Sequence, residues 1–431
     1  MANEYNSRSE RREHEEDEQR HRESKGAATA NANGSGPKKP RRKKSPWRWL
    51  LYLLILILIA LFVFGGMLYA KSKNAVDNSY KPSNIKKARN VDKVLNDGKP
   101  FSVLLLGTDT GEFGRDYKGR TDSMMLVTVN PKENKTTIMS IPRDSLVAVP
   151  GYESEFPAKI NSAYEDGSSA ATIRTVQDWL NVPIDFYALV NMGGLEKVVN
   201  QVGGIEVKSP LTFDFNPNTA HSEGDDLYHF TKGSSTYTHT KNGQTKTYDT
   251  MDGRAALAFS RMRYADPNGD YGRQERQRLV MQGILDKIKQ NPTKVLSSNF
   301  IEEIGKSTQT DMTFGDVMKI GTKYVSAANN IKSDHIQGNG YNLSSGSTEV
   351  VYRGEQQRAT DVLRKSLDLK QKQTGNLYSG DVSDETMIAN GVPTLAQSEA
   401  LSNSDGNSDT SNIAPQTDGV ATGSAGGSTT N

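Results

Sequence analysis

The chain contains no cysteine among its 431 residues, and this absence excludes several classes of protein. Without thiols it holds no disulfide scaffold, thiolate zinc site, iron–sulfur cluster or cysteine nucleophile. The sequence also lacks the Gly-x-Ser-x-Gly elbow of serine hydrolases, the His-Glu-x-x-His zinc motif and the phosphate-cradling Gly-x-x-x-x-Gly-Lys-Ser/Thr loop. Hydrolysis by a serine triad or by zinc is therefore not expected.

The chain also lacks an excess of either charge, because 53 Lys and Arg residues face 51 Asp and Glu residues. A net charge of +2 predicts no nucleic acid as a partner, so the position of each charge matters more than the total. The mean hydropathy of −0.66 and the 38 glycines make the chain more polar than a compact domain needs. Part of it is therefore expected to be disordered.

Residues 1–46 are almost entirely polar and end in a basic cluster, which predicts a disordered arm. The cluster consists of Lys38, Lys39, Arg41, Arg42, Lys43 and Lys44. An uncharged apolar run follows from Trp49 to Ala70. At about 1.5 Å per helical residue this run covers about 33 Å, enough for the hydrocarbon core of a bilayer. We therefore expect a transmembrane helix over residues 47–70.

A basic cluster directly before a membrane span indicates a cytoplasmic N-terminus. Two other interpretations are a nucleic-acid-binding patch and a cleaved signal peptide, whose apolar region is usually shorter and closer to the start of a chain. With the membrane helix in place, the residues after 70 are expected to lie outside the cytoplasm.

Composition divides the rest of the chain into three parts. Residues 71–99 are expected to form an extracellular tether, and residues 100–370 carry nearly all of the strand and helix signals, a length that suits one domain. After Lys372 there is no Lys or Arg, and acidic residues are scattered among Ser, Thr, Asn and Gly. Residues 371–431 are therefore expected to form a disordered acidic tail.

Apolar runs alternate with helical periodicity within residues 100–370. Strands are expected at residues 101–107, 124–130, 136–142, 184–190 and 205–207. Helices are expected at residues 168–180, 194–202, 252–263, 273–289 and 314–328. Continuous apolar strands suggest a sheet that is covered on both faces. The predicted fold class is α/β: a single extracellular three-layer α-β-α domain with a mixed central sheet, preceded by one transmembrane helix and flanked by disordered arms.

Two aspartates lie where predicted strands end or begin. Asp109 follows the strand 101–107, and Asp122 precedes the strand 124–130. Carboxylates that converge at the edge of a sheet hold Mg²⁺ in many proteins, because this ion prefers oxygen ligands. The simpler alternative is that Asp109 caps a turn and that Asp122 pairs with Arg120.

Arginines gather at two places in the sequence. Arg143 follows Pro142, which ends the strand 136–142 and directs the arginine off the strand end. Six more lie around an expected break at residues 269–272: Arg254, Arg261, Arg263, Arg273, Arg276 and Arg278. Arg273, Arg276 and Gln277 are spaced i, i+3 and i+4, which predicts one helix face that binds a pyrophosphate. The alternatives are a surface ion pair for Arg143 and a solvated helix face.

Three histidines lie in a polar segment rich in Gly and Thr: His221, His229 and His239. Their wide spacing lacks the regularity of metal ligands, so a surface loop is expected here. The aspartates and arginines thus carry the chemistry that the sequence predicts. Carboxylates for Mg²⁺ and guanidinium groups for phosphate, close to a membrane, suggest phosphoryl chemistry on a lipid-linked substrate.

A series of motifs over residues 101–284 resembles the LytR-CpsA-Psr family of membrane-anchored cell-wall proteins of Gram-positive bacteria. In chain order the motifs are LLLGTD, GRTDSMMLVTVNP, TIMSIPRDSLV, KINSAYEDG, IDFYALVNMGGLEKVVNQVGGIEV and DGRAALAFSRMRYADPNGDYGRQERQRLV. The resemblance implies a phosphotransferase located at the cell membrane. Such an enzyme moves a glycopolymer, such as wall teichoic acid or a capsular polysaccharide, from an undecaprenyl pyrophosphate carrier to peptidoglycan.

The resemblance also implies roles for single residues. Asp109 and Asp122 would hold Mg²⁺, and both would take part in catalysis together with Arg143, Arg273 and Arg276. The implied pyrophosphate-binding set consists of Arg120, Arg143, Arg261, Arg263, Arg273, Arg276 and Gln277. The base that accepts the proton of the acceptor hydroxyl is left open, because a carboxylate bound to Mg²⁺ is a poor base.

Three other functions are compatible with the same residues. Water in place of the sugar hydroxyl would make the protein a lipid pyrophosphate phosphatase. The other two are a regulator that acts indirectly through the state of the cell envelope and a non-catalytic binder of the carrier lipid. Direct DNA binding by the N-terminal arm is not expected, because the arm has neither the length nor the pattern of a helix-turn-helix and carries many acidic residues.

Overall fold

The computed structural model describes residues 79–108, 119–291 and 307–404, together with positions 70, 73, 74, 77 and 305. All of them belong to the unit Gly65–Asn431. Within this described part, no helix is both long enough and apolar enough to cross a membrane. The predicted arm 1–46, the predicted span 47–70 except for its last residue, and residues 405–431 lie outside the described residues.

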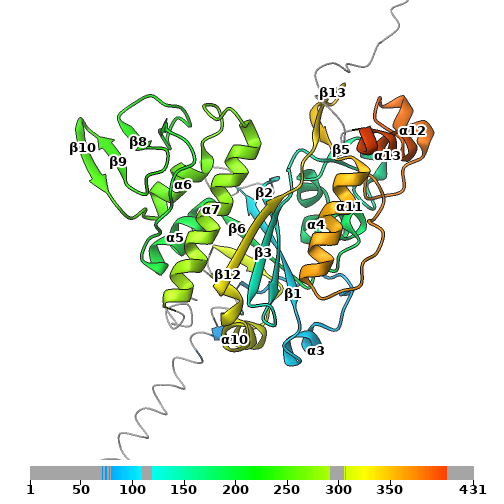
Figure 1. The fold of residues 1–431 in the computed structure, drawn as a ribbon, viewed down its shortest axis with the longest axis horizontal. Coiled ribbons are helices and arrows are strands. Elements are labelled where there is room, and N and C mark those ends of the chain that lie inside the picture. The colour runs from blue at the N-terminus through cyan, green and yellow to red at the C-terminus, as the bar shows by residue number, and fades with distance from the viewer. Residues whose placement is uncertain are drawn as a thin grey trace, which may run out of the picture. The chain divides into compact units, whose positions relative to one another are not determined.

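A six-stranded mixed sheet forms the centre of the fold (Figure 1). Its strands, in spatial order, are β11 (Thr308–Thr310), β6 (Phe186–Asn191), β1 (Phe101–Thr108), β2 (Thr121–Asn130), β3 (Lys135–Ser140) and β12 (Asn330–His335). β2 is antiparallel to both β1 and β3, whereas β6 is parallel to β1 and β12 is parallel to β3. The end of β1, the start of β2 and the end of β3 therefore lie at the same end of the sheet.

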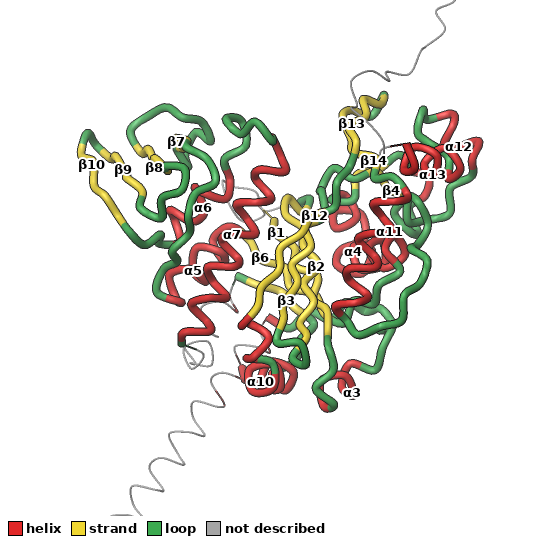
Figure 2. Tube along the Cα trace, viewed as in Figure 1, coloured by secondary structure: helices red, strands yellow, loops and turns green. Residues whose placement is uncertain are grey.

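Side chains of the central strands alternate between two apolar cores, so both faces of the sheet are covered. Leu104 and Leu126 belong to the core that includes side chains of α4 (Ser162–Leu180) and α11 (Arg353–Ser366). Met125 points to the opposite face, where side chains of α7 (Gly269–Gln290) pack. Helices thus lie on both sides of the strands, which gives the predicted α/β fold with a mixed sheet (Figure 2).

A second sheet of four antiparallel strands shares an apolar core with two further helices and part of α7. The strands, in spatial order, are β10 (Gln244–Tyr248), β9 (Tyr237–Lys241), β8 (Asp226–Phe230) and β7 (Phe213–Phe215), and the helices are α5 (Met192–Val202) and α6 (Gly253–Arg261). Asp252 caps α6, because its side chain accepts a hydrogen bond from the backbone N–H of Ala255.

This second sheet corrects the prediction of a surface loop around the histidines. His229 lies on β8 and His239 on β9, and only His221 lies outside a strand. His239 stacks on Tyr228 with 4.0 Å between ring centroids, and its Nε2 is 2.6 Å from Asp226 Oδ1. The exposed faces of these strands are polar, so the segment as a whole resembles a loop in composition while its alternate aromatic residues are buried.

Residues 80–99, predicted as part of a tether, are folded against the domain. Within them, α3 (Val91–Asn96) buries Val94 and Leu95 in a core shared with the central sheet. Arg89 forms an ion pair with the buried carboxylate of Asp185. The charged residues that suggested a solvated tether thus have partners at long range in the sequence, which composition does not reveal.

Residues 371–404, predicted as the start of a disordered tail, are folded as well. They contain α12 (Asp384–Ala389) and α13 (Leu395–Ser404), and α13 packs on α11. Tyr378 and Met387 are buried in a core with Leu146. Few apolar residues stand among many polar ones here, but several of them are buried against the domain, so the domain extends beyond the predicted boundary at 370.

The remaining elements are short and complete the described chain. They are β4 (Leu146–Val147), η1 (Glu153–Glu155), β5 (Ala158–Lys159), α10 (Phe314–Lys323), η2 (Val325–Asn329), β13 (Asn339–Leu343) and β14 (Gly346–Val350). The strands predicted at 101–107, 124–130 and 136–142 coincide with β1, β2 and β3 to within a few residues. The helices predicted at 194–202, 252–263 and 273–289 coincide with α5, α6 and α7 in the same way. The break expected at 269–272 is wrong, because these residues form the first turn of α7.

We expect a chain that ends at Lys372 to unfold at a lower urea concentration than a chain that ends at Ser404. The shorter chain loses Leu377, Tyr378 and Met387 from their core, and burial of each such side chain contributes about 1.5–3 kcal/mol. The measurement is urea unfolding followed by circular dichroism. Equal midpoints for the two chains would show that residues 373–404 add nothing to stability.

Candidate functional site

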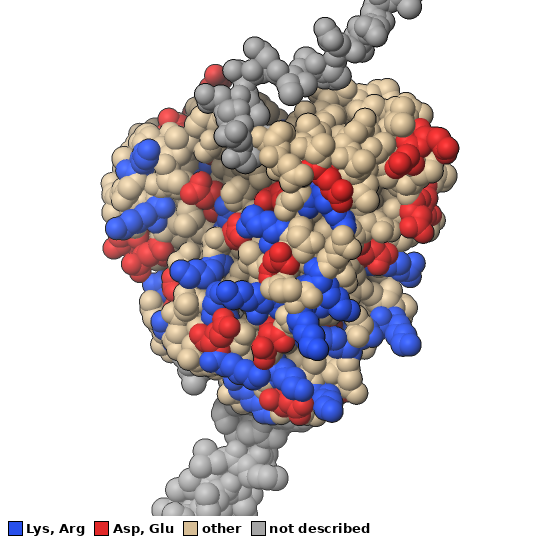
Figure 3. Space-filling model, turned by 45° about the vertical axis from the view of Figure 1, so that its right-hand side comes forward, with Lys and Arg blue, Asp and Glu red and all other residues tan. Residues whose placement is uncertain are grey.

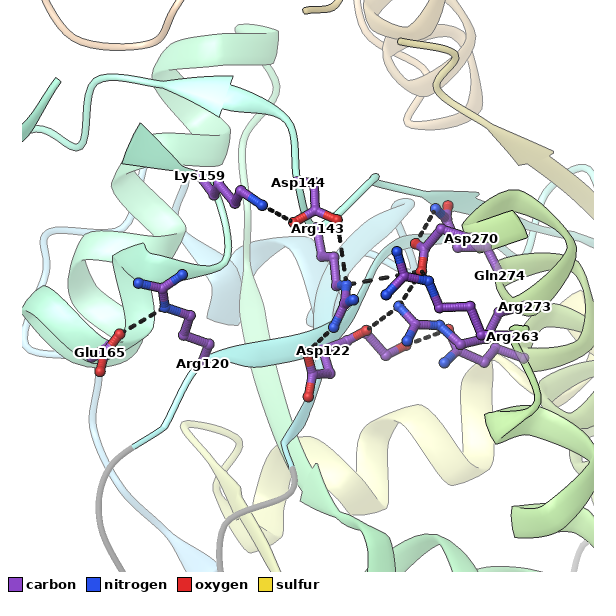
Figure 4. A network of polar contacts seen from close by, with 12 residues as sticks. Arg120, Asp122, Arg143, Asp144, Lys159, Glu165, Arg263, Asp270, Arg273 and Gln274 are labelled. Atoms are coloured by element: carbon purple, nitrogen blue, oxygen red, sulfur yellow. Dashed lines mark hydrogen bonds and ion pairs between the residues drawn. The ribbon is translucent and has the colours of Figure 1, made fainter. Parts of the chain in front are cut away.

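The ends of the central strands place two predicted site residues beside each other. Asp122 lies near the start of β2, and Arg143 follows the end of β3 by three residues. Because these strands are antiparallel neighbours, Met125 of β2 pairs with Ser140 of β3, and the two charged residues meet at the same end of the sheet. Arg143 Nη1 donates to Asp122 Oδ1 (Figure 4).

Asp270, in the first turn of α7, is the centre of an arginine cluster. Its Oδ1 lies 2.5 Å from Arg273 Nη2, 3.8 Å from Arg263 Nε and 3.9 Å from Arg143 Nε. The three arginines come from α7, from the α6–α7 connection and from the loop after β3 (Figure 4). We call Arg143, Arg263, Arg273 and Asp270 the arginine cluster.

A second carboxylate fixes the outer side of this cluster. Asp144 Oδ2 lies 3.6 Å from Arg143 Nε, and Lys159 Nζ donates to Asp144 Oδ1 at 2.9 Å. Lys159 lies on β5, which pairs with β4. Arg143 lies in the connection between β3 and β4, so strand pairing holds both ends of this connection. A further cation thus lies next to the arginine cluster.

Several buried polar atoms of this region lack a hydrogen-bond partner within the described residues. They are Arg143 Nε, Arg273 Nε, Asp270 Oδ1 and Gln274 Oε1. Most buried polar atoms of folded proteins are hydrogen-bonded, and exceptions that gather in one place are typical of functional sites. Two of the four are guanidinium N–H donors, so the site retains donor capacity for an anion.

The electrostatic environment differs between the two more buried arginines of the cluster, Arg273 and Arg143. Burial lowers the pKa of Arg273, and the neighbouring charges of Arg143 and Arg263 act in the same direction. Burial also acts to lower the pKa of Arg143, but Asp122, Asp270 and Asp144 outweigh it, so the pKa of Arg143 is raised. Both guanidinium groups stay charged at neutral pH, and an anion that relieves the repulsion around Arg273 is favoured at this site.

Gln277 also points to this end of the sheet, one turn along α7 from Arg273. Its Oε1 accepts a hydrogen bond of 3.0 Å from Ser123 Oγ, next to Asp122. The structure therefore brings together five of the predicted site residues. They are Asp122, Arg143, Arg263, Arg273 and Gln277.

Arg276 points away from the arginine cluster, contrary to the predicted shared helix face. Its side chain is fully buried and donates to Asp266 and to the backbone oxygens of Phe259 and Met262. Its guanidinium carbon also lies 5.2 Å from the ring centroid of Phe213. The structure thus places Arg276 where it ties α7 to α6 and to the connection between them.

Two other predicted residues also lie apart from the cluster. Arg120 forms an exposed ion pair with Glu165, with 2.9 Å between Nε and Oε2 (Figure 4). Arg261 Nη1 donates to the backbone oxygen of Pro217 at 3.3 Å, on the side of the four-stranded sheet. These two arginines contact different elements from the ones that form the cluster.

The two predicted Mg²⁺ ligands can be examined only in part. Asp109 lies outside the described residues, although Thr108, just before it, pairs with Thr121, just before Asp122. Asp122 exposes 37% of its side chain and offers the oxygen chemistry that Mg²⁺ prefers. Within the described ranges, no group of three or more His, Asp or Glu side chains is placed to hold a metal. Of the two predicted Mg²⁺ ligands, Asp122 is thus the one within the described residues, and its carboxylate supplies the oxygen chemistry that this ion prefers.

Sequence reasoning missed the central carboxylate of the site. The break predicted at residues 269–272 includes Asp270, whereas the structure places Asp270 three residues before Arg273 on one helix. The i, i+3 spacing of Asp270 and Arg273 is the sequence signal from which their contact could have been predicted. Gln274 has a comparable signal, because it lies at i+4 from Asp270 and donates to its Oδ2 at 3.2 Å. Lys159 has none, because a lone polar residue is typical of any surface.

Charges of both signs are interspersed on the face shown in Figure 3. Long-range attraction by a broad basic surface is therefore weak there, since neighbouring opposite charges offset each other and salt screens exposed charges beyond about 10 Å. An anion is expected to be recognised locally, by guanidinium groups that converge on it. Taken together, the fold and the site define an α/β protein with a cluster of arginines at one end of its central sheet, an arrangement that can bind an anion.

Comparison with known proteins identifies the group to which this fold belongs. The model of the LytR_cpsA_psr family matches residues 66–367. A protein of Enterococcus faecalis named polyisoprenyl-teichoic acid–peptidoglycan teichoic acid transferase TagU is 38% identical over 311 residues, which cover 72% of this chain and 93% of the relative. Biofilm regulatory protein A of Streptococcus mutans is 35% identical over 343 residues, 76% of this chain and 80% of the relative.

A solved structure shares the fold as well. The crystal structure of a Streptococcus agalactiae protein matches with a TM-score of 0.57 and 31% identity, covering 70% of this chain and 98% of that one. The chain belongs to the LytR_cpsA_psr family. The resemblance seen in the sequence motifs is thereby confirmed, and with it the expectation of an enzyme of this family.

Arg276→Ala is expected to lower the free energy of unfolding by about 3–5 kcal/mol, because it leaves the buried carboxylate of Asp266 without its cation. Arg263→Ala should change the same quantity by less than about 1 kcal/mol, since Arg263 exposes 43% of its side chain. Urea unfolding of both variants measures the difference. Equal effects of the two substitutions would contradict the structural role of Arg276.

Proposed function

We propose that this protein is a phosphotransferase that attaches an anionic cell-wall glycopolymer, of teichoic-acid or capsular type, to peptidoglycan. The donor in this proposal is an undecaprenyl pyrophosphate carrier that bears the glycopolymer. The observation that carries the proposal is the arginine cluster, in which three guanidinium groups from separate elements converge on Asp270. The names of the relatives, which include a teichoic acid transferase, support the same reaction class.

The geometry suits a pyrophosphate because its charge is distributed over several oxygens. Guanidinium groups offer planar, paired donors that match phosphate oxygens, and they remain charged when buried. Arg143 and Arg273 each expose less than a fifth of their side chains, so little water competes for their N–H groups. Donors fixed in this way would stabilise the charge that develops on the phosphoryl oxygens during transfer.

In this proposal Asp109 and Asp122 hold Mg²⁺ beside the arginine cluster. The ion would supply Lewis-acid stabilisation of phosphate charge, as in other phosphoryl-transfer enzymes. Asp122 would then have a second task, because its Oδ1 also accepts the hydrogen bond of Arg143. Through this contact, the position of Arg143 would depend on the state of Asp122.

The proposed location follows from the predicted membrane helix at residues 47–70. A cytoplasmic N-terminus places the folded domain outside the cell membrane, close to both a lipid-linked donor and peptidoglycan. The segment before α3 packs on the domain, with Lys87 paired to Asp311, so the distance between the domain and the membrane would be short.

Two other functions use the same site. A lipid pyrophosphate phosphatase would hydrolyse the donor without an acceptor, and its product differs from that of a transferase. A regulatory effect, suggested by the name of the Streptococcus mutans relative, would be indirect and would follow from changes in the envelope.

The test is a transfer assay with the full chain in detergent, a synthetic prenyl pyrophosphate glycan and a peptidoglycan oligomer. The wild type is expected to form a phosphodiester-linked glycan on the acceptor, and EDTA is expected to abolish the product. Arg273→Ala should lower the rate by about 10²–10³-fold, the loss typical of a fixed donor to a charged transition state.

Arg174→Ala is the matched control, because Arg174 is an exposed residue of α4 outside the arginine cluster. Its rate should equal that of the wild type. Release of phosphorylated glycan without linkage to the acceptor would identify a phosphatase. Tight binding of the lipid without turnover would identify a carrier-lipid binder.

A further inference from the structure

A partly buried carboxylate that the sequence motifs do not include lies beside the arginine cluster. Glu349 is on β14, and its carboxylate accepts a hydrogen bond from the hydroxyl of Tyr271, the residue that follows Asp270 on α7. The same Tyr271 hydroxyl accepts a hydrogen bond of 2.7 Å from the backbone N–H of Gly338. Tyr271 and Glu349, which are 78 positions apart in the chain, are thus linked by a hydrogen bond.

The backbone holds Glu349 close to the loop that carries Arg143. The N–H of Glu349 donates to the carbonyl oxygen of Asp144 at 2.9 Å, and the hydroxyl of Thr348 donates to the same oxygen at 2.8 Å. Glu349 is therefore fixed from two directions, through Tyr271 to Asp270 and through Asp144 to Arg143. Asp270 and Arg143 belong to the arginine cluster, and Asp144 forms an ion pair with Arg143.

The packing around this carboxylate is tight. A Cβ atom at Gly338 would lie 2.9 Å from both Cβ and Oε2 of Glu349 and 3.4 Å from the Tyr271 hydroxyl. Only a residue without a side chain leaves room for this arrangement. The position of the carboxylate is thus determined by its surroundings, which a group that exchanges protons with a substrate requires.

Glu349 differs from the other carboxylates near the cluster in its partners. Asp122, Asp144 and Asp270 each form an ion pair with Arg or Lys. Among the described residues Glu349 has no such ion pair, and its partner is the neutral Tyr271 hydroxyl. Of these four carboxylates, Glu349 is therefore the one without an ion pair to Arg or Lys within the described residues.

The pKa of Glu349 is raised above the ordinary value of a glutamate, mainly by burial. Burial raises the pKa of Glu349, and the charges of Asp270 and Asp144 raise it further, against the hydrogen bond of Tyr271 and the charge of Lys159. His335 also lies nearby, with 5.6 Å between the centroid of its ring and that of Tyr271. A carboxylate whose pKa is closer to neutrality is a better general base than an ordinary one.

We propose that Glu349 is the general base of the transfer reaction and that Tyr271 positions it. This inference rests on the proposed transferase function. The acceptor hydroxyl oxygen would attack the phosphorus that bears the glycopolymer, and its proton would pass to a Glu349 carboxylate oxygen. A new phosphorus–oxygen bond forms, and the bond to the bridging oxygen breaks, so that its electron pair leaves with the prenyl phosphate.

The test compares transfer rates of the full chain and its Glu349→Gln variant across pH, with the donor and acceptor described above. Glutamine keeps the size of the side chain and an oxygen that accepts the Tyr271 hydrogen bond. We expect kcat to fall by about 10²–10⁴-fold with little change in the KM for the lipid donor. The wild-type rate should rise with pH as Glu349 loses its proton, and the variant should lack this rise.

Two further variants separate a base from a structural residue. Tyr271→Phe removes a hydrogen bond that lowers the pKa of Glu349, so the rise in rate should move to higher pH. Glu206→Gln is the matched control, because Glu206 pairs with Lys287 near the other end of α7, and it should behave as the wild type.

The outcomes for this inference and for the proposed function are distinct. If the wild type transfers glycan and Glu349→Gln keeps its rate and pH dependence, Glu349 is not the base. If the wild type forms no linked product with any acceptor, the transferase function itself is wrong. A loss of activity in Glu349→Gln together with a loss of lipid-donor binding or of the native circular dichroism spectrum would assign Glu349 a structural role.

Discussion

Repulsion among three closely placed arginines is the constraint on which the site depends. Arg143, Arg263 and Arg273 carry the same charge, and their partial burial strengthens the repulsion because less water screens it. Asp270 offsets this cost by contacting all three, and its place in the first turn of α7 is one that the helix dipole favours for a carboxylate. Asp122 and Asp144 neutralise Arg143 further, so a pyrophosphate would bind through guanidinium N–H groups without a hydrogen-bond partner in the described residues, such as Arg143 Nε and Arg273 Nε.

The elements that supply these arginines are held in place by contacts outside the cluster. Arg276, three residues after Arg273, is fully buried and binds the backbone of α6 and of the connection that carries Arg263. The antiparallel pairing of β2 and β3 brings Asp122 and Arg143 to one end of the sheet. Arg273 thus belongs to the proposed anion site, whereas Arg276, on the same helix, stabilises the packing of α7 on α6.

The central strands and helices were predictable because neighbouring segments pair with one another and their apolar periodicity is strong. The positions of Asp122 and Arg143 followed from those strand ends. Arg276 could not be assigned in the same way, because α7 is covered by the central sheet on one side and by α5 and α6 on the other. A helix buried on two sides has no single polar face. Arg273 and Gln277 therefore share the end of the sheet as their spacing predicts, whereas Arg276 between them points to the other side.

The sequence by itself determined the family, the mixed α/β architecture and the two strand ends that carry charge, because motifs, hydropathy and local strand pairing act over short distances along the chain. Only the tertiary structure decided where the domain ends, which arginines converge and how Glu349 meets Tyr271. Those features depend on burial and on ion pairs between residues far apart in the sequence. Their energies arise only when the layers pack, so no local pattern encodes them.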